Sequence, residues 1–68
     1  MDTPKLVCIC TICQHGARAP LWYSSSRDEY SYDAFDDKDV WRESVLGYRT
    51  LESALVAAQH ALEHVIAS

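Results

Sequence analysis

The spacing of hydrophobic residues divides the chain into several short segments of strand character and one long segment of helical character. The range Leu6–Cys13 is rich in Val, Ile, Cys and Thr and contains neither Gly nor Pro, which is typical of a β-strand. Apolar residues occupy both the even-numbered and the odd-numbered positions of this range, and so both faces of the strand. We therefore expect a strand that is covered on both faces and lies in the centre of a sheet.

Turn-forming residues separate this strand from two further ones. Gln14–Ala19 contains a glycine and is predicted as a loop, after which Pro20 opens a second strand, Leu21–Ser25, because proline is tolerated at the first residue of a strand. The polar range Ser26–Glu29 fits a hairpin connection. Tyr30–Phe35 then continues as a third strand, in which the period of two places the tyrosines at 30 and 32 on one face.

The range Val40–Leu46 fits both a helix and a strand. Its β-branched and aromatic residues favour a strand, and Gly47 follows shortly before a helix begins. Before it, Asp36–Asp39 is predicted as a solvated turn. We therefore expect a strand over 40–46.

The last third of the chain predicts one amphipathic helix. Thr50 is a good N-cap, Glu52 places negative charge in the first turn, and Ser53 takes the place of the Glu or Gln of a capping box. The apolar stripe includes three alanines, which allow a close approach to a sheet; it consists of Leu51, Ala54, Leu55, Ala58, Ala61, Leu62, Val65 and Ile66. Together the segments predict a single α+β domain, 1–68, with a three- or four-stranded antiparallel sheet and this helix on one face.

Composition restricts the class of protein further. With 68 residues, of which 49% are hydrophobic, the chain forms at most one small globular domain, either monomeric or homodimeric. The longest apolar run, Leu6–Cys10, is too short to cross a membrane. The first residues lack the basic start and long apolar stretch of a signal peptide, and three crowded cysteines do not form a secreted disulfide framework. We therefore expect a cytoplasmic protein.

The net charge of −4 arises within one segment. Arg27–Asp39 holds six acidic and two basic residues, and the remaining charges of the chain cancel. An acidic segment disfavours contact with nucleic acid or anionic lipid and favours a basic protein partner, although a solvated loop has the same composition. Tyrosines interleave with the acids and would anchor an interface. The predicted partner-binding residues are Asp28, Glu29, Tyr30, Tyr32, Asp33, Asp36, Asp37 and Asp39.

Cysteines and histidines form the other candidate constellation. Cys8, Cys10 and Cys13 follow a C-x-C-x-x-C pattern, and His60 and His64 stand one helical turn apart. The histidines fall on the helix face turned away from the sheet, so we expect solvated histidines, buried structural cysteines and no bound metal. The alternatives are a zinc site formed by the three cysteines with His15, and a redox pair of thiols.

Catalysis finds no support in the remaining residues. The chain has no Gly-rich loop that cradles phosphate and no Ser-His-Asp grouping, and clustered surface carboxylates are usually a solvated face. A pair of carboxylates with separated pKa values needs a deep cleft, which so small a domain does not easily form. We therefore expect a protein that is not an enzyme and uses no cofactor.

Two resemblances bear on function. The range Leu46–Leu55, LGYRTLESAL, followed by alanines at 57, 58 and 61, resembles the strand-to-helix junction of HicB-like antitoxin domains. That resemblance implies an antiparallel sheet that runs into a helix, in an antitoxin that sequesters a small basic toxin. By its size and its concentrated negative charge, the chain is similar to phage-encoded anti-CRISPR proteins that mimic DNA. This similarity implies an inhibitor whose acidic surface engages the basic site of a nucleic-acid-binding complex.

Overall fold

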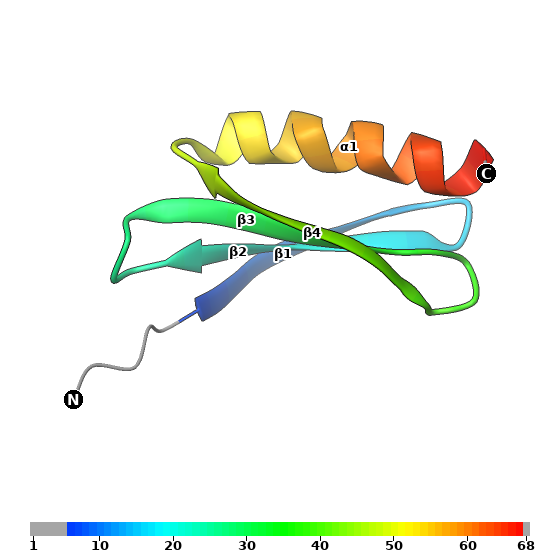
Figure 1. Ribbon diagram of the computed structural model, residues 1–68, viewed down its shortest axis with the longest axis horizontal. Coiled ribbons are helices and arrows are strands. Elements are labelled where there is room, and N and C mark those ends of the chain that lie inside the picture. The colour runs from blue at the N-terminus through cyan, green and yellow to red at the C-terminus, as the bar shows by residue number, and fades with distance from the viewer. Residues whose placement is uncertain (1–5, 68) are drawn as a thin grey trace.

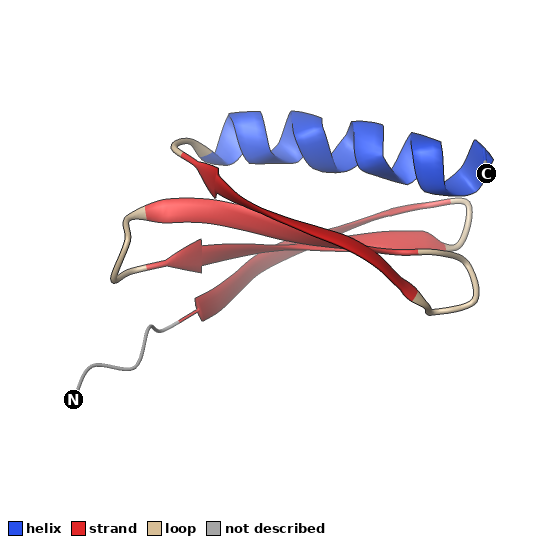
Figure 2. Ribbon diagram, viewed as in Figure 1, coloured by secondary structure: helices blue, strands red, loops and turns tan. Residues whose placement is uncertain are grey.

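The computed structural model describes residues 6–67 as four strands and one helix. The strands β1 (Leu6–Gln14), β2 (Ala17–Ser24), β3 (Glu29–Phe35) and β4 (Trp41–Tyr48) form an antiparallel sheet in the order β1-β2-β3-β4, and α1 (Leu51–Ala67) follows. The helix lies along one face of this sheet (Figure 1). No other described helix or strand covers the opposite face (Figure 2). The predicted α+β fold is thereby confirmed, with four strands.

The β1–β2 connection is tighter than predicted. His15 and Gly16 have positive φ angles of 50° and 85°, and together they form a two-residue hairpin turn. The strand after this turn therefore begins at Ala17, inside the range predicted as a loop. Pro20 lies within β2 instead of opening it, and the β2–β3 pairing passes from Arg18↔Phe35 directly to Leu21↔Tyr32. An interior proline is compatible with the strand because the ladder is interrupted beside it.

The position of β1 corrects a second expectation. The strand lies at the edge of the sheet, not in its centre, and its Leu6, Val7 and Ile9 side chains are 56%, 55% and 41% exposed. Apolar residues of both parities predict a strand but do not reveal how many neighbours that strand has. The helix packs mainly on β2 and β3 and covers little of β1.

The core between the helix and the sheet is built largely from alanine. Ala17, Ala19 and Ala34 on the sheet and Ala54 and Ala58 on the helix are each 0% exposed. Leu21 and Leu62 are the largest side chains that are completely buried among the described residues. Small side chains on both surfaces let the helix backbone approach the sheet closely, as the alanines of the helical stripe predicted.

The strand ladders fix which residues face the helix. Leu21 pairs with Tyr32, which pairs with Val45, and all three pack in or against the core. The side chains between these positions point to the other face, because successive residues of a strand alternate. Gly47 lies inside β4 with φ of 92°, at the bulge between the Tyr30↔Tyr48 and Tyr32↔Val45 pairs. The strand predicted over 40–46 is confirmed and extends past this glycine.

The start of α1 has the predicted cap. The Thr50 hydroxyl accepts a hydrogen bond from the backbone N–H of Ser53 at 3.1 Å, and the Ser53 hydroxyl donates to the Thr50 carbonyl at 3.0 Å. Ser53 does not form the second bond of a capping box, because its hydroxyl donates to a carbonyl whereas the usual Glu or Gln accepts from the N-cap N–H. Two substitutions test the Thr50 cap and the packing of α1 on the sheet.

Thr50→Ala removes the hydroxyl that accepts from the first turn. We expect the free energy of unfolding to fall by about 1 kcal/mol, measured by urea denaturation. Thr50→Ser keeps the acceptor and serves as the control. Equal losses in both variants would show that the hydroxyl does not stabilise the helix.

Ala58→Leu places a larger side chain at a position that is 0% exposed between helix and sheet. Because neither surface can yield without separating the alanine contacts, we expect a loss of ~1–3 kcal/mol by the same measurement. Gln59→Leu, at the exposed neighbouring position, is the matched control and should change stability by less than about 0.5 kcal/mol. A fully stable Ala58→Leu variant would contradict the close packing of α1.

Candidate binding face

The sheet face that points away from α1, named here the outer face, carries a hydrogen-bonded row of polar and aromatic side chains. The Trp22 indole N–H on β2 donates to Asp33 Oδ2 on β3 at 3.1 Å. The Ser44 hydroxyl on β4 donates to the other oxygen of the same carboxylate, and the Trp41 indole N–H donates to Ser44 Oγ at 2.8 Å. Side chains of three strands therefore form one chain of hydrogen bonds, in which Trp22 contacts the carboxylate directly and Trp41 reaches it through Ser44.

A cation already lies on an aromatic ring of this face. The Arg18 guanidinium carbon lies 4.4 Å from the centre of the Phe35 ring, and the two residues are paired across β2 and β3. A guanidinium at this distance is attracted by the negative face of the ring. One basic side chain of the protein itself therefore already contacts an aromatic ring of the outer face through a cation–π interaction.

Part of the outer face is open to solvent. Trp41 is 57% exposed, whereas Trp22 and Asp33 are half-buried. Near the β2–β3 turn lies a shallow hollow of about 190 Å³. It is lined by Leu6, Ser24, Arg27, Glu29, Ser31 and Leu46. The hollow is smaller than the roughly 300–1,000 Å³ of small-molecule pockets, so its size suits a single side chain.

The structure distributes the predicted acidic residues over the length of β3. Asp28 lies in the β2–β3 turn, where it accepts from the Tyr23 hydroxyl at 2.8 Å, and this hydrogen bond raises the pKa of Tyr23. Glu29 lines the hollow, and Asp33 lies in the row between the indoles. The remaining acids, Asp36, Asp37 and Asp39, lie beyond the other end of β3. The segment is therefore a line of carboxylates, not one cluster.

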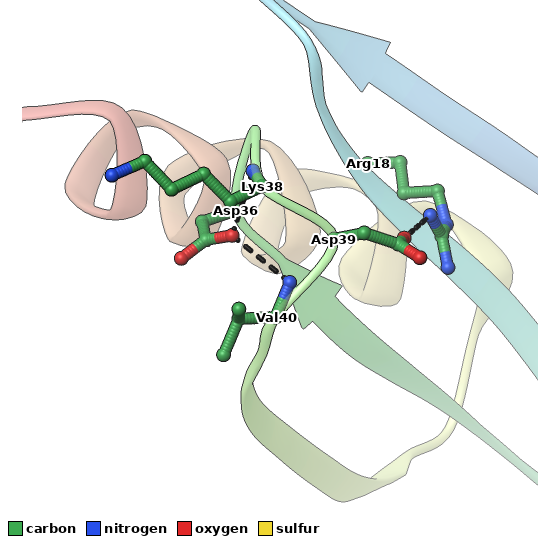
Figure 3. Close-up of polar contacts among 5 residues, drawn as sticks. All are labelled: Arg18, Asp36, Lys38, Asp39 and Val40. Carbon is green, nitrogen blue, oxygen red and sulfur yellow. Dashed lines mark hydrogen bonds and ion pairs between the residues drawn. The ribbon is translucent and has the colours of Figure 1, made fainter.

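Asp36 organises the β3–β4 turn. Its Oδ1 accepts from the backbone N–H groups of Lys38 at 2.9 Å and Val40 at 3.0 Å (Figure 3). Its Oδ2 lies 3.4 Å from the Arg42 guanidinium. The backbone hydrogen bond from Val40, foremost among these contacts, holds the pKa of Asp36 below its ordinary value. This carboxylate stabilises the turn that was predicted only as solvated.

Asp39 at the end of the same turn forms an ion pair with Arg18 (Figure 3). The two arginines that pair with Asp36 and Asp39 belong to other segments of the sequence, Arg18 to β2 and Arg42 to β4. Folding thus neutralises part of a charge that appears concentrated along the chain.

Tyr30 and Tyr32 share a face, as predicted, but it is the face beneath the helix. Tyr32 is only 4% exposed, donates to Glu43 Oε2 at 3.2 Å and stacks on Tyr48 with ring centres 6.0 Å apart. Tyr30 is half-buried against the core, and its ring contacts that of Tyr23. The two tyrosines therefore pack in the domain and do not join Asp33 on a binding surface, because residues of opposite parity in β3 point to opposite faces.

The cysteines correct another expectation. All three are exposed instead of buried. Cys8 and Cys13 pair with Trp22 and Arg18 on the outer face, whereas Cys10, after a bulge, pairs with Leu21 on the inner face. The thiols thus divide between the two faces of an edge strand.

The histidines are solvated. His60 and His64 on α1 are exposed, as predicted, and so is His15 in the β1–β2 turn. Among the described residues, no three His, Cys, Asp or Glu side chains lie together in a way that could hold a metal ion.

The central residues of the outer face were only partly visible in the sequence. Asp33 belongs to the acidic segment that the charge pattern indicated, but no sequence pattern placed Arg18 or Ser44 on the same sheet face. The signal that identifies them is the strand register, because Arg18↔Phe35 and Asp33↔Ser44 are direct cross-strand pairs. These registers depend on the turn at residues 25–28 between β2 and β3 and on the bulges in β4.

The fold and this face together define the class of structure: a two-layer α+β domain with one sheet face left open. The chain matches no protein-family model, and comparisons with curated proteins and with solved structures give no match either. Within the described residues, no helix combines the length and apolar character needed to cross a membrane.

The buried hydroxyl of Tyr32 generates a pH prediction. Burial, with the nearby Glu43 carboxylate, raises the pKa of Tyr32 above its ordinary value of 10.0. The unfolded chain therefore loses the hydroxyl proton at a lower pH than the folded chain. The contribution of this protonated hydroxyl to the free energy of unfolding is complete below about pH 10 and declines as the pH rises further.

We expect the free energy of unfolding to fall above about pH 10, and Tyr32→Phe to reduce the slope of that fall. Urea denaturation of the wild type and of Tyr32→Phe at several alkaline pH values measures this dependence of the free energy of unfolding on pH. Identical slopes in the two proteins would contradict the raised pKa of the hydroxyl.

Proposed function

We propose that this protein is a non-enzymatic binding protein that inhibits or links a partner by occupying its basic site through the outer face. The observation that carries this proposal is the row in which Asp33 accepts from the Trp22 indole and from Ser44, which in turn accepts from the Trp41 indole, on a sheet face that α1 leaves open. A carboxylate in a row with aromatic rings is suited to the cationic side chains of a basic surface.

The hydrogen bonds of Asp33 leave room for a ligand. A carboxylate has about four acceptor sites, and Trp22 and Ser44 use two of them. An arginine of the partner can therefore donate to Asp33 while its guanidinium plane lies on an indole ring. Because the indoles are already fixed by hydrogen bonds, they lose little conformational freedom on binding.

The placement of the other acids favours a basic site that normally binds nucleic acid. Asp33 lies within β3, a strand of seven residues, whereas Asp28 lies in the turn before it and Asp37 in the turn after it. At about 3.3 Å per residue, the strand that separates the two turns is roughly 20 Å long. Carboxylates spaced in this way on a rigid sheet can take the positions of phosphates, which supports an inhibitor of the DNA-mimic, anti-CRISPR type.

A small basic toxin is a second partner with the same chemistry. The resemblance to HicB-like antitoxins rests on the Leu46–Leu55 range, and β4 indeed runs into α1 there through the Thr50 cap. This junction supports an antitoxin role as an alternative. Competition separates the two partners, because only binding at a nucleic-acid site is displaced by added DNA or RNA.

The binding chemistry is testable without the natural partner. We expect a short peptide with two arginines to shift the indole N–H resonances of Trp22 and Trp41, and the same peptide with citrulline in place of arginine to leave them unchanged. Asp33→Asn retains hydrogen-bonding groups for Trp22 and Ser44 but removes the charge. It should weaken arginine-peptide binding roughly fivefold, because an exposed charge pair contributes up to ~1 kcal/mol.

Glu63→Gln is the matched control, since it removes the same charge from an exposed position of α1, away from the outer face. We expect it to alter affinity less than Asp33→Asn, and affinity in the wild type to fall with rising salt. Equal weakening by both variants would mean that net charge alone attracts the peptide. Indole resonances that do not respond to the arginine peptide would overturn the role of the outer face.

A further inference from the structure

The two edges of the sheet differ in their protection against further pairing. β4 carries the charged residues Arg42 and Glu43 and is bent by two bulges, one of which contains Gly47. Charges and bulges of this kind prevent strands from pairing edge to edge. β1 is the longest strand of the sheet, contains no charged residue and no proline, and has one bulge, between Cys8 and Cys10.

The sequence of β1 also differs from that of an ordinary edge strand. Its apolar residues occupy both parities, a pattern typical of strands that have neighbours on both sides and are covered on both faces. Yet Leu6, Val7 and Ile9 remain exposed in the single chain. A further strand at this edge gives β1 its second neighbour, and the side chains of that strand shield part of this apolar surface from the side.

We infer that two copies of this chain pair antiparallel through β1, which joins their sheets into one of eight strands. A second copy suits this edge because β1 is neutral, so that two chains of net charge −4 meet without opposed charges along the strand. A twofold axis perpendicular to the sheet preserves the face of every side chain. It therefore places both α1 helices on one side and joins the two outer faces on the other.

This inference does not depend on the proposed function, because the pairing uses the backbone edge of β1 and not the row around Asp33. The regular stretch Cys10–Gln14, which keeps a constant register with β2, offers the longest uninterrupted ladder for the second copy. Its exposed thiols need not be oxidised, since strand pairing relies on main-chain hydrogen bonds.

The test is the mass of the full chain in solution under reducing conditions, measured by sedimentation equilibrium over a range of concentrations. We expect twice the mass of a single chain. The double variant Ile9→Lys and Thr11→Lys places two exposed charges in the middle of the edge, and it should sediment as a folded monomer. The matched control, Val56→Lys with Gln59→Lys, makes the same charge change on exposed positions of α1 and should remain a dimer.

Amide hydrogen exchange locates the interface and verifies folding of the variants. Alternate amides of β1 should exchange slowly in the wild type and quickly in the β1 double variant, while the protection of β2 and β3 stays the same. A wild-type chain that is monomeric at every concentration overturns the inference. So does a β1 double variant that remains dimeric, or protection that appears along β4 instead of β1.

Discussion

The close contact of alanine with alanine between α1 and the strands β2 and β3 is the constraint on which the rest of the structure depends. Ala17, Ala19 and Ala34 on the sheet and Ala54 and Ala58 on the helix supply much of the core between the two layers. The larger side chains of the covered face, Leu21 and Tyr32, are enclosed in the same core. Trp22, Phe35 and Trp41 occupy the alternate positions of their strands and lie on the outer face.

The elements that the sequence predicted well are those whose signals are local. Thr50 and the helical stripe specify α1 because a cap and a period of 3.6 require no knowledge of the sheet. The neighbours of β1 could not be predicted, because apolar residues of both parities look alike in a central strand and in an uncovered edge. Similarly, the shared face of Tyr30 and Tyr32 follows from the period of two, but which of the two faces meets the helix depends on the packing of the alanines.

The charge of the candidate site likewise looks different along the sequence and in the folded domain. Along the chain, Arg27–Asp39 accounts for the whole net charge. In the fold, Arg18 and Arg42 approach from β2 and β4 to pair with Asp39 and Asp36, so these acids stabilise the domain. Asp33, like Asp28, instead accepts hydrogen bonds from neutral donors, and of these two acids it is Asp33 that lies in the row with the indoles. Counting charge in the sequence pointed to the segment around β3, whereas the register singles out Asp33 within it.

One helix can cover only part of a four-stranded sheet, and this geometric limit explains why both candidate surfaces lie where they do. Because α1 lies over β2 and β3 on one side of the sheet, it leaves the outer face open (Figure 1). It also covers little of β1, which is the edge strand of the sheet. The two surfaces differ in chemistry: the outer face offers a carboxylate and aromatic rings, whereas β1 offers backbone groups and aliphatic side chains. A charged ligand is suited to the first and a neutral strand to the second. The proposed binding of a basic partner and the inferred pairing of two copies are therefore compatible, since the first rests on the row around Asp33 and the second on the backbone edge of β1.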